Sequence, residues 1–283
     1  MPGMTETVFD RRAVRLHRDR ATRTVHAVRP ILQDAAERLL DRLDDTTRRC
    51  TRAHDIGGRG VVAPLLRARG IEVVSCDLSA RMAALSGSPC IAADEEWLPF
   101  APDSFDLVVA SLSLHWINDL PGALIQLRRA MQPDGLLLAS LPALGTLGAL
   151  RTALTAAEAE VSDGASPRVS PFPDLRDLAG LLQRAGFALP VADVEAIELS
   201  YADPFALLQD LRDAGETNAV ALRSRHTPRA LFASALSALP ARDGRIPVLL
   251  RFATMTGWAP GPAQPKPLQP GSARTSLSDA LEG

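Results

Sequence analysis

The sequence predicts an α/β fold built on a doubly wound, parallel sheet, and three observations predict it. Between residues 53 and 140, short aliphatic or β-branched runs alternate with segments of helical periodicity, as in βαβ units. The run Asp-Leu-Val-Val-Ala-Ser at 106–111 is typical of a strand that is covered on both faces. A glycine-rich turn at 55–60 follows the first run and begins a helix. In such a sheet, ligands bind beyond the carboxyl ends of the strands.

The first half of the chain holds five expected strands and the helices between them. Strands are expected at 53–56, 71–76, 90–93, 106–111 and 136–140. Helices are expected at 31–43, 61–69, 79–85 and 119–131. In 31–43 the apolar residues recur at helical spacing, with aspartates and arginines on the other face. Pro133-Asp134-Gly135 predicts a turn before the fifth strand.

The second half reads differently, because helical patterns dominate after residue 145. Helices are expected at 147–161, 175–185, 204–214 and 228–239, and two further strands at 192–201 and 246–255. Five prolines in residues 259–270 indicate an extended tail. We therefore expect four parts, which are a basic helical segment at 1–30, a Rossmann-like core at 31–142, a helical cap with the last two strands at 143–258, and a proline-rich tail at 259–283.

Charge is balanced over the whole chain but uneven along it. The 283 residues are 46% hydrophobic and carry a formal net charge of −2, which excludes a disordered chain and argues against nucleic acid as a partner. All but one of the 31 basic residues are arginines, a bias that either reflects codon usage or serves to bind carboxylates and phosphates. Residues 1–30 hold seven arginines against three acids. That segment is either a solvated helix face or a lid or partner surface.

Several classes of protein are excluded by what the sequence lacks. The three cysteines have no C-x-x-C spacing, and the five histidines form no H-E-x-x-H motif, so neither a disulfide framework nor a metal site is predicted. The longest uncharged stretch, 135–150, is interrupted by one proline and two internal glycines, so no transmembrane helix is expected. No secretory signal is visible. These features predict a cytoplasmic protein, and they leave the oligomeric state open.

Polar residues gather where the predicted strands end. Asp55 to Gly60 can bring backbone close to a ligand at a helix N-terminus, although glycine turns are also common as structural elements. Asp77 ends the second strand, where a carboxylate can accept hydrogen bonds from ribose hydroxyls. Asp94 and Glu95 follow the third strand; each acid taken alone is equally a turn or cap residue. Ser111 to Trp116 follows the fourth strand, and His115 within it is a candidate base or a structural histidine.

These residues and others resemble the class I S-adenosylmethionine (SAM)-dependent methyltransferases, and more specifically the methyltransferase-like assembly factors of respiratory complex I. The markers shared with the methyltransferases are 55–60, Asp77, 93–100, 103–108 and 132–135. The markers shared with the assembly factors are 9–11, 113–121, 166–172, 184–187, 215–218, 256–258 and 270–273. The resemblance covers nearly the whole chain. It implies a Rossmann-like, seven-stranded sheet with a helical insertion after the fifth strand.

The resemblance also implies a SAM site and a set of residues for it. Gly57, Gly58 and Gly60 would line the methionine and ribose side, Asp77 would hold the ribose, and Asp94 with Glu95 would face the adenine. The remaining members of the expected cofactor site are Asp55, Leu78 and Ser111, and His115 is the expected catalytic residue. Family members are linked to complex I assembly and to hydroxylation of an arginine on one subunit. A protein substrate is therefore expected, with peripheral contact to the inner membrane.

Two departures from the family pattern bear on the reaction. The glycine loop is one residue shorter than the usual D-x-G-x-G-x-G, and the family's G-G-D-T-L turn reads Ala143-Leu144-Gly145-Thr146-Leu147 here, without its aspartate. Three functions follow as alternatives. The chain is a SAM-dependent methyltransferase that modifies a protein, an arginine hydroxylase of a complex I subunit, or an assembly chaperone without catalysis.

Overall fold

The computed structural model describes residues 7–264, apart from 162–165 and 225, and contains one mixed sheet. Its strand order is β3-β2-β1-β4-β5-β7-β6. The strands β1 to β5 are parallel to one another, and β7 runs antiparallel to both β5 and β6. The strands are β1 Arg52–Ile56, β2 Glu72–Asp77, β3 Cys90–Ala92, β4 Phe105–Ser111, β5 Met131–Pro142, β6 Ala188–Tyr201 and β7 Ile246–Trp258. The expected α/β fold with a doubly wound, seven-stranded sheet is confirmed.

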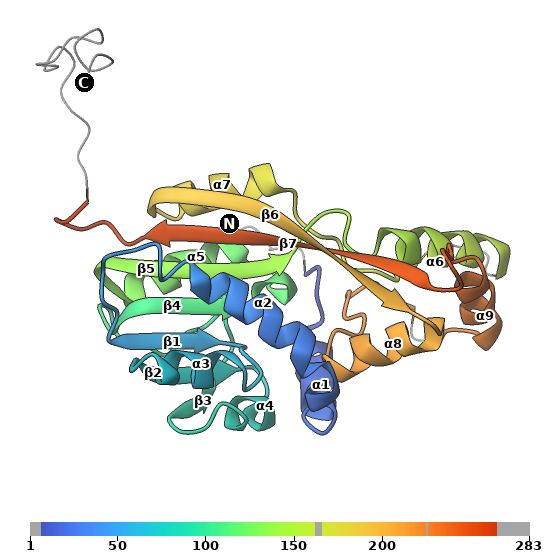
Figure 1. The fold of residues 1–283 in the computed structure, drawn as a ribbon, viewed down its shortest axis with the longest axis horizontal. Coiled ribbons are helices and arrows are strands. Elements are labelled where there is room, and N and C mark those ends of the chain that lie inside the picture. The colour runs from blue at the N-terminus through green and yellow to red at the C-terminus, as the bar shows by residue number, and fades with distance from the viewer. Residues whose placement is uncertain (1–6, 162–165, 225, 265–283) are drawn as a thin grey trace, which may run out of the picture.

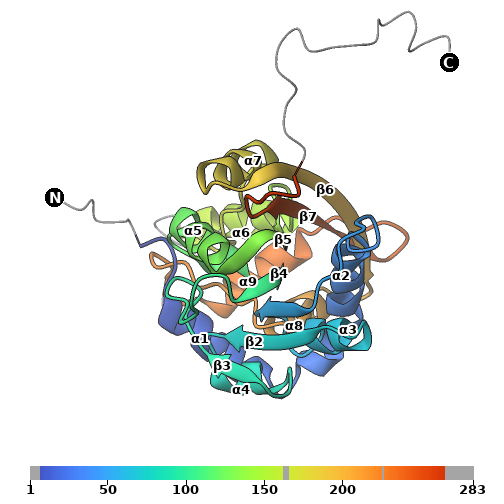
Figure 2. The same ribbon diagram turned by 90° about the vertical axis from the view of Figure 1, so that its left-hand side faces the viewer.

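Helices cover both faces of the sheet. The helices α2 (Arg29–Asp41) and α3 (Val62–Ala68) lie on one face, and α5 (Leu120–Ala130) and α7 (Leu175–Arg184) lie on the other (Figure 2). Each face has its own apolar cluster, because β4 is buried along its whole length and alternates its side chains between the two. This two-sided burial explains why the sequence of β4 is an almost unbroken apolar run.

The register of the parallel strands brings the candidate site residues to one edge. Ile56 at the end of β1 lies opposite Cys76 of β2, so that the glycine loop and Asp77 leave the sheet side by side. The amide of Gly57 donates to the Cys76 carbonyl at 2.8 Å and ties the two ends together. The short helix α4 (Ala80–Ala84) then begins at Ser79, whose hydroxyl accepts from the Met82 amide.

Three strands are longer than the sequence indicates. The strand β5 begins at Met131, because this residue still pairs with Phe105 of β4 before the register shifts. The Pro133-Asp134-Gly135 segment therefore lies within a strand as an irregularity, with Asp134 at φ 61°. The strand β6 starts at Ala188 rather than 192, and β7 reaches Trp258 rather than 255. Antiparallel pairing between β6 and β7 extends both strands beyond their apolar runs.

The cap lies at the carboxyl ends of the parallel strands. The helices α6 (Gly148–Val161), α8 (Pro204–Asp213) and α9 (Arg229–Ser237) gather there with the outer parts of β6 and β7 (Figure 1). Their apolar side chains form a cluster of their own, separate from the two clusters of the sheet. The cap thus encloses the edge at which the expected site residues emerge.

The basic N-terminal segment lies at the same edge. It forms α1 (Arg11–Ala21), which begins at Asp10, and a short 3-10 helix, η1 (Val25–Val28). Arg18 on α1 is only 1% exposed, so the segment is not simply a solvated basic face. Part of its positive charge therefore points into the protein.

Candidate functional site

The glycine loop after β1 is closely packed against its surroundings. Gly57 and Gly60 have positive φ angles of 61° and 75°, which glycine adopts without strain. A Cβ atom on Gly58 would lie 2.2 Å from Oδ1 of Asp55, and a Cβ atom on Gly57 would lie 2.9 Å from Nη1 of Arg18. The backbone therefore approaches both neighbours as closely as glycine permits.

Asp55 lies behind this loop rather than with the other acids. Its carboxyl group is fully buried and accepts from the hydroxyl of Ser75 at 3.0 Å, while Oδ1 has no hydrogen-bond partner in the described part of the chain. Burial raises the pKa of Asp55 to about 7, although the Ser75 hydrogen bond lowers it. A buried carboxyl group that holds its proton more tightly than usual thus packs behind the loop.

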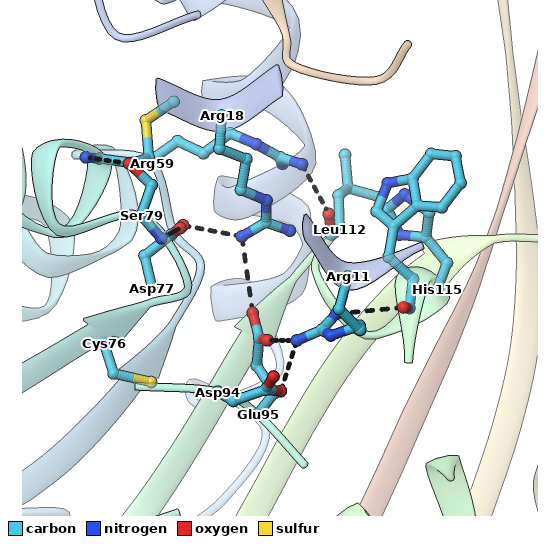
Figure 3. A network of polar contacts seen from close by, with 12 residues as sticks. Arg11, Arg18, Arg59, Cys76, Asp77, Ser79, Asp94, Glu95, Leu112 and His115 are labelled. Atoms are coloured by element: carbon cyan, nitrogen blue, oxygen red, sulfur yellow. Dashed lines mark hydrogen bonds and ion pairs between the residues drawn. The ribbon is translucent and has the colours of Figure 1, made fainter. Parts of the chain in front are cut away.

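Asp77 pairs with α1. Its Oδ2 accepts from Nη1 of Arg18 at 2.7 Å, and its Oδ1 accepts from the backbone amide of Ser79 at 2.8 Å. Arg18 also lies 3.6 Å from Oε1 of Glu95. Figure 3 shows the Arg18 guanidinium between these two carboxylates. The Nε and Nη2 atoms of Arg18 are buried without a partner among the described residues.

Asp94 and Glu95 pair with the same helix, one side of which carries both arginines. Nη2 of Arg11 donates to Oδ1 of Asp94 at 2.6 Å and also to Glu95 (Figure 3). Nη1 of Arg11 donates to the Trp116 carbonyl at 3.1 Å. Burial lowers the pKa of Arg11, but the neighbouring acids outweigh burial and raise it overall. The structure thus brings Asp77, Asp94 and Glu95 together in one network.

His115 belongs to a second cluster, centred on Glu216. Nε2 of His115 lies 2.7 Å from Oε2 of Glu216, and Nε1 of Trp116 donates to the same oxygen at 2.8 Å. Arg59 of the glycine loop pairs with the other oxygen, Oε1. Burial raises the pKa of Glu216, but its interactions with the His115 ring and the Arg59 guanidinium more than compensate and hold it well below its usual range. Glu216 is therefore an ionised carboxylate that orients an imidazole.

Leu78 and Ser111 take no part in either hydrogen-bonded cluster. Leu78 is half-buried and packs on the apolar cluster that contains Phe9 and Trp116. Ser111 is buried at the end of β4, opposite Ser140 of β5. Both residues lie near the site, so their expected contact with a cofactor stays a prediction.

Sequence reasoning did not single out Arg11, Arg18 or Glu216. Each contacts its partners across a long stretch of chain, since 59 residues separate Arg18 from Asp77 and 101 separate His115 from Glu216. Two signals were available. The arginines are seven positions apart on α1, which places them on one helix face, and Glu216 lies in the family-like Gly-Glu-Thr-Asn segment.

The polar groups at this edge are of the kinds that SAM needs, but the Arg18–Asp77 ion pair must open before SAM can bind. An acid at the end of β2, two acids after β3 and left-handed glycines after β1 are the groups that would receive ribose, adenine and the amino-acid end. However, Asp77 and Arg18 are each 1% exposed, so a ribose can reach Asp77 only if Arg18 withdraws. The described conformation is therefore a closed one.

Comparison with known proteins identifies the family. The model of the methyltransferase domain family matches residues 26–190. The chain belongs to this family. It is 34% identical to the protein named arginine-hydroxylase NDUFAF5, mitochondrial, of Danio rerio, over 96% of this chain and 89% of that protein. It is 33% identical to malonyl-(acyl-carrier protein) O-methyltransferase of Halorhodospira halophila, over 92% and 91% of the two chains. The fold is shared with YcgJ of Bacillus subtilis, with a TM-score of 0.55 at 16% identity, over 79% of this chain and 98% of YcgJ.

The family match settles several expectations. It confirms the resemblance to class I methyltransferases, and it assigns SAM as the cofactor and methyltransferase as the class of enzyme. In the described residues no helix combines the length and the hydropathy that crossing a membrane requires. The specific substrate, the partner and the cellular location stay predictions.

Proposed function

We propose that this protein is a SAM-dependent, methyltransferase-fold enzyme that modifies a protein substrate during assembly of respiratory complex I. The observation that carries the proposal is the His115–Glu216 pair, 2.7 Å apart, at the carboxyl edge of the sheet. It lies next to the acids Asp77 and Glu95, and it lines the cavity beneath the cap. The relatives named arginine-hydroxylase NDUFAF5, which align over nearly the whole chain, support the link to assembly.

In this proposal His115 is the base. Because the Glu216 carboxylate accepts at Nε2, the neutral imidazole ring keeps its lone pair on Nδ1. Nδ1 is buried and has no partner among the described residues, so it can accept a proton from a substrate nucleophile once the closed site opens. Bound SAM supplies an electrophilic methyl group. Trp116 and Arg59 hold Glu216 in place and so fix the ring.

Cofactor binding requires a movement of α1. Arg18 must release Asp77 for the ribose, and Arg11 must release Asp94 for the adenine. Neither arginine then loses all its partners, since Arg18 can keep Glu95 and Arg11 can keep the Trp116 carbonyl. We therefore propose that α1 acts as a lid that alternates between closing the empty cofactor site and admitting SAM.

The test combines binding with mass spectrometry. SAM binding is measured by calorimetry on the purified full chain, with Asp77→Ala as the variant that should abolish it and Asp174→Ala, at the N-terminus of α7, as a matched surface control. The candidate complex I subunits are then co-expressed with the wild-type protein or with His115→Gln. A methyl group added by wild type and lost in His115→Gln supports the proposal. Absence of SAM binding by the wild type contradicts it.

Arginine hydroxylation is the second candidate, favoured by the printed name of the relatives. Insertion of one oxygen atom into a C–H bond needs an oxidant, and with molecular oxygen it also needs a two-electron reductant. In the same co-expression experiment, this reaction adds the mass of an oxygen atom to an arginine instead of a methyl group. That outcome would replace methyl transfer while leaving the SAM-binding result unaffected.

A non-catalytic assembly chaperone is the third candidate, and the closed α1 network favours it. Arg11 and Arg18 satisfy the cofactor acids without any ligand. In this case the protein binds a complex I subunit, yet neither SAM binding nor a change in the subunit's mass is observed. The same two measurements therefore distinguish all three functions.

A further inference from the structure

The cavity that the His115–Glu216 pair lines lies between the cap and the carboxyl edge of the sheet, and most of it extends away from that pair into the cap. Its volume is about 450 Å³, within the roughly 300–1,000 Å³ that is usual for small-molecule sites. The wall is built from η1, α2, α6, α8, α9, β6 and β7, from the glycine loop, from Leu112, His115 and Trp116 after β4, and from the loops around Arg168 and Glu216. The cap and the carboxyl edge of the sheet therefore enclose the cavity together.

The cap core is hollow because of this cavity. Seven apolar residues belong to the cap cluster but stay only partly buried, and every one of them lines the cavity: Val169, Leu199, Tyr201, Leu208, Leu211, Phe232 and Leu250. Protein cores normally pack to the density of organic crystals, and a gap of this size forfeits contacts along its whole wall. Such a wall is suited to an apolar ligand that restores the missing contacts.

The polar end of the cavity favours an acceptor on the ligand. The charged residues that line it are four arginines and two acids: Arg59, Arg168, Arg212, Arg223, Asp210 and Glu216. Both acids are already hydrogen-bonded, Glu216 to Arg59, His115 and Trp116, and Asp210 to the Tyr201 hydroxyl at 2.9 Å. By contrast, Nε of Arg59 is a buried donor without a partner among the described residues. Because both acids are already paired and four arginines line this end, it favours an anionic ligand over a cationic one.

We propose that this cavity binds an aliphatic carboxylic acid, with the hydrocarbon chain among the cap leucines and the carboxylate at Arg59. Arg168 shows in this same chain how such a pair is made, because its Nε and Nη2 hold both oxygens of Glu158 at 2.5 and 2.8 Å. At Arg59, Nη2 donates to the Leu112 carbonyl and to Glu216, whereas Nε has no partner among the described residues and is buried, so a ligand carboxylate reaches Nε through a small movement of the side chain. The cavity shares His115 and Glu216 with the proposed reaction site but does not include Asp77 or Glu95, so binding of a carboxylic acid can be measured without SAM and without the reaction.

The test uses dodecanoate and dodecylammonium as probes, both below their micelle-forming concentrations, with the full-length protein. Binding is measured by calorimetry and by the shift in thermal midpoint. We expect dodecanoate to bind and to stabilise the protein, and dodecylammonium to bind at least tenfold more weakly. Equal binding of the two amphiphiles, or no binding of dodecanoate, overturns the proposal.

Variants locate the probe. Leu208→Trp fills the cavity from the partly buried face of α8 and should weaken dodecanoate binding at least tenfold, whereas Ile125→Trp on the exposed face of α5 should leave it unchanged. Arg59→Gln should reduce the preference for dodecanoate over dodecylammonium. If Leu208→Trp does not fold, Leu211→Phe tests the same wall with a smaller side chain. Dodecanoate binding that survives a folded cavity-filling variant contradicts the assignment.

Discussion

Arg18 donates to Asp77 at 2.7 Å, and both side chains are almost completely removed from solvent. This contact joins the basic N-terminal helix to the acid that ends β2, 59 residues away. A buried ion pair is costly to break from one side, since the remaining charge stays buried without a counterion. The contact therefore bears on both the stability of the protein and its access to a cofactor.

The first prediction concerns stability. Arg18→Met should lower the free energy of unfolding by about 3–5 kcal/mol, because Asp77 and Glu95 lose their buried partner. The double variant Arg18→Met/Asp77→Asn should recover part of this loss, because it removes a buried charge as well. Urea denaturation measures both values. As a control, Arg38→Met at the exposed Asp34 pair should change stability little. If Arg18→Met and Arg38→Met lower the free energy of unfolding equally, the buried ion pair contributes no more to stability than the exposed one.

The second prediction concerns SAM. Because Arg18 occupies Asp77 in the closed form, Arg18→Met should increase SAM affinity, by about tenfold if the open form is a minor one. Asp77→Ala should abolish binding. Calorimetry measures the SAM affinity of both variants, after circular dichroism has shown that each is folded. If Arg18→Met loses affinity together with Asp77→Ala, then Arg18 contributes to the cofactor site and is not a competitor for it.

The third prediction separates catalysis from binding at the second cluster. His115→Gln should lower the rate of substrate modification by about 10²- to 10⁴-fold, which is the usual contribution of a general base. SAM affinity should stay unchanged, because His115 contacts Glu216 and not the cofactor acids. Glu216→Gln should lower the rate as well and should also shift the pH profile, since Glu216 orients the imidazole ring. Loss of SAM binding in His115→Gln would instead indicate a structural role.

The sequence predicts the sheet and its acids well, and predicts their partners poorly. Asp77 and Asp94 follow local strand signals, and parallel strands bring their carboxyl ends to one edge, so their proximity follows from the fold class alone. The pairing of Arg18 with Asp77 depends instead on how α1 docks. No local pattern encodes that docking, because a basic helix face is usually solvated.

Glu216 illustrates the same limit on the catalytic side. It follows α8 in the cap, and only the docking of the cap on the sheet brings it to His115. The irregularity at Asp134 has a comparable origin, because a proline-aspartate-glycine sequence is typical of a turn and only pairing with Phe105 draws it into β5. Tertiary contacts, rather than local propensity, decide these three features.

The fourth prediction concerns pH, at neighbouring residues of β1. Burial raises the pKa of Asp55 from 3.8 to about 7 and lowers the pKa of His54 from 6.5 to about 4. The folded state holds the Asp55 proton more tightly than the unfolded state, so Asp55 contributes stability at low pH that is lost as the pH rises from about 4 to 7, by about 4 kcal/mol. His54 acts in the opposite direction, and its contribution, about 3 kcal/mol, is gained as the pH rises from about 4 to 6.5.

In the wild type the opposite effects of Asp55 and His54 on the free energy of unfolding largely cancel as the pH changes. Single variants should therefore reveal the pH dependence that each residue contributes. Asp55→Asn should become more stable as the pH rises from 4 to 6.5, because Asp55 no longer offsets the contribution of His54. His54→Phe, which keeps an aromatic ring against Phe105, should become less stable over the range from 4 to 7. Urea unfolding at several pH values measures these slopes. Variants that keep the wild-type profile would show that neither pKa is shifted.

The fifth prediction concerns the glycine loop. Gly60 has φ 75°, and a Cβ atom there would lie 2.9 Å from the Leu85 carbonyl oxygen, a backbone atom that cannot rotate away. Gly60→Ala should therefore lower the free energy of unfolding by about 1–3 kcal/mol. Gly180→Ala is the matched control, because Gly180 lies within α7 with no atom near the added Cβ. That variant should be more stable than wild type by about 0.5–1 kcal/mol, because alanine favours helix. If both substitutions have the same sign, the loop is not held in the left-handed conformation that closes it against α4.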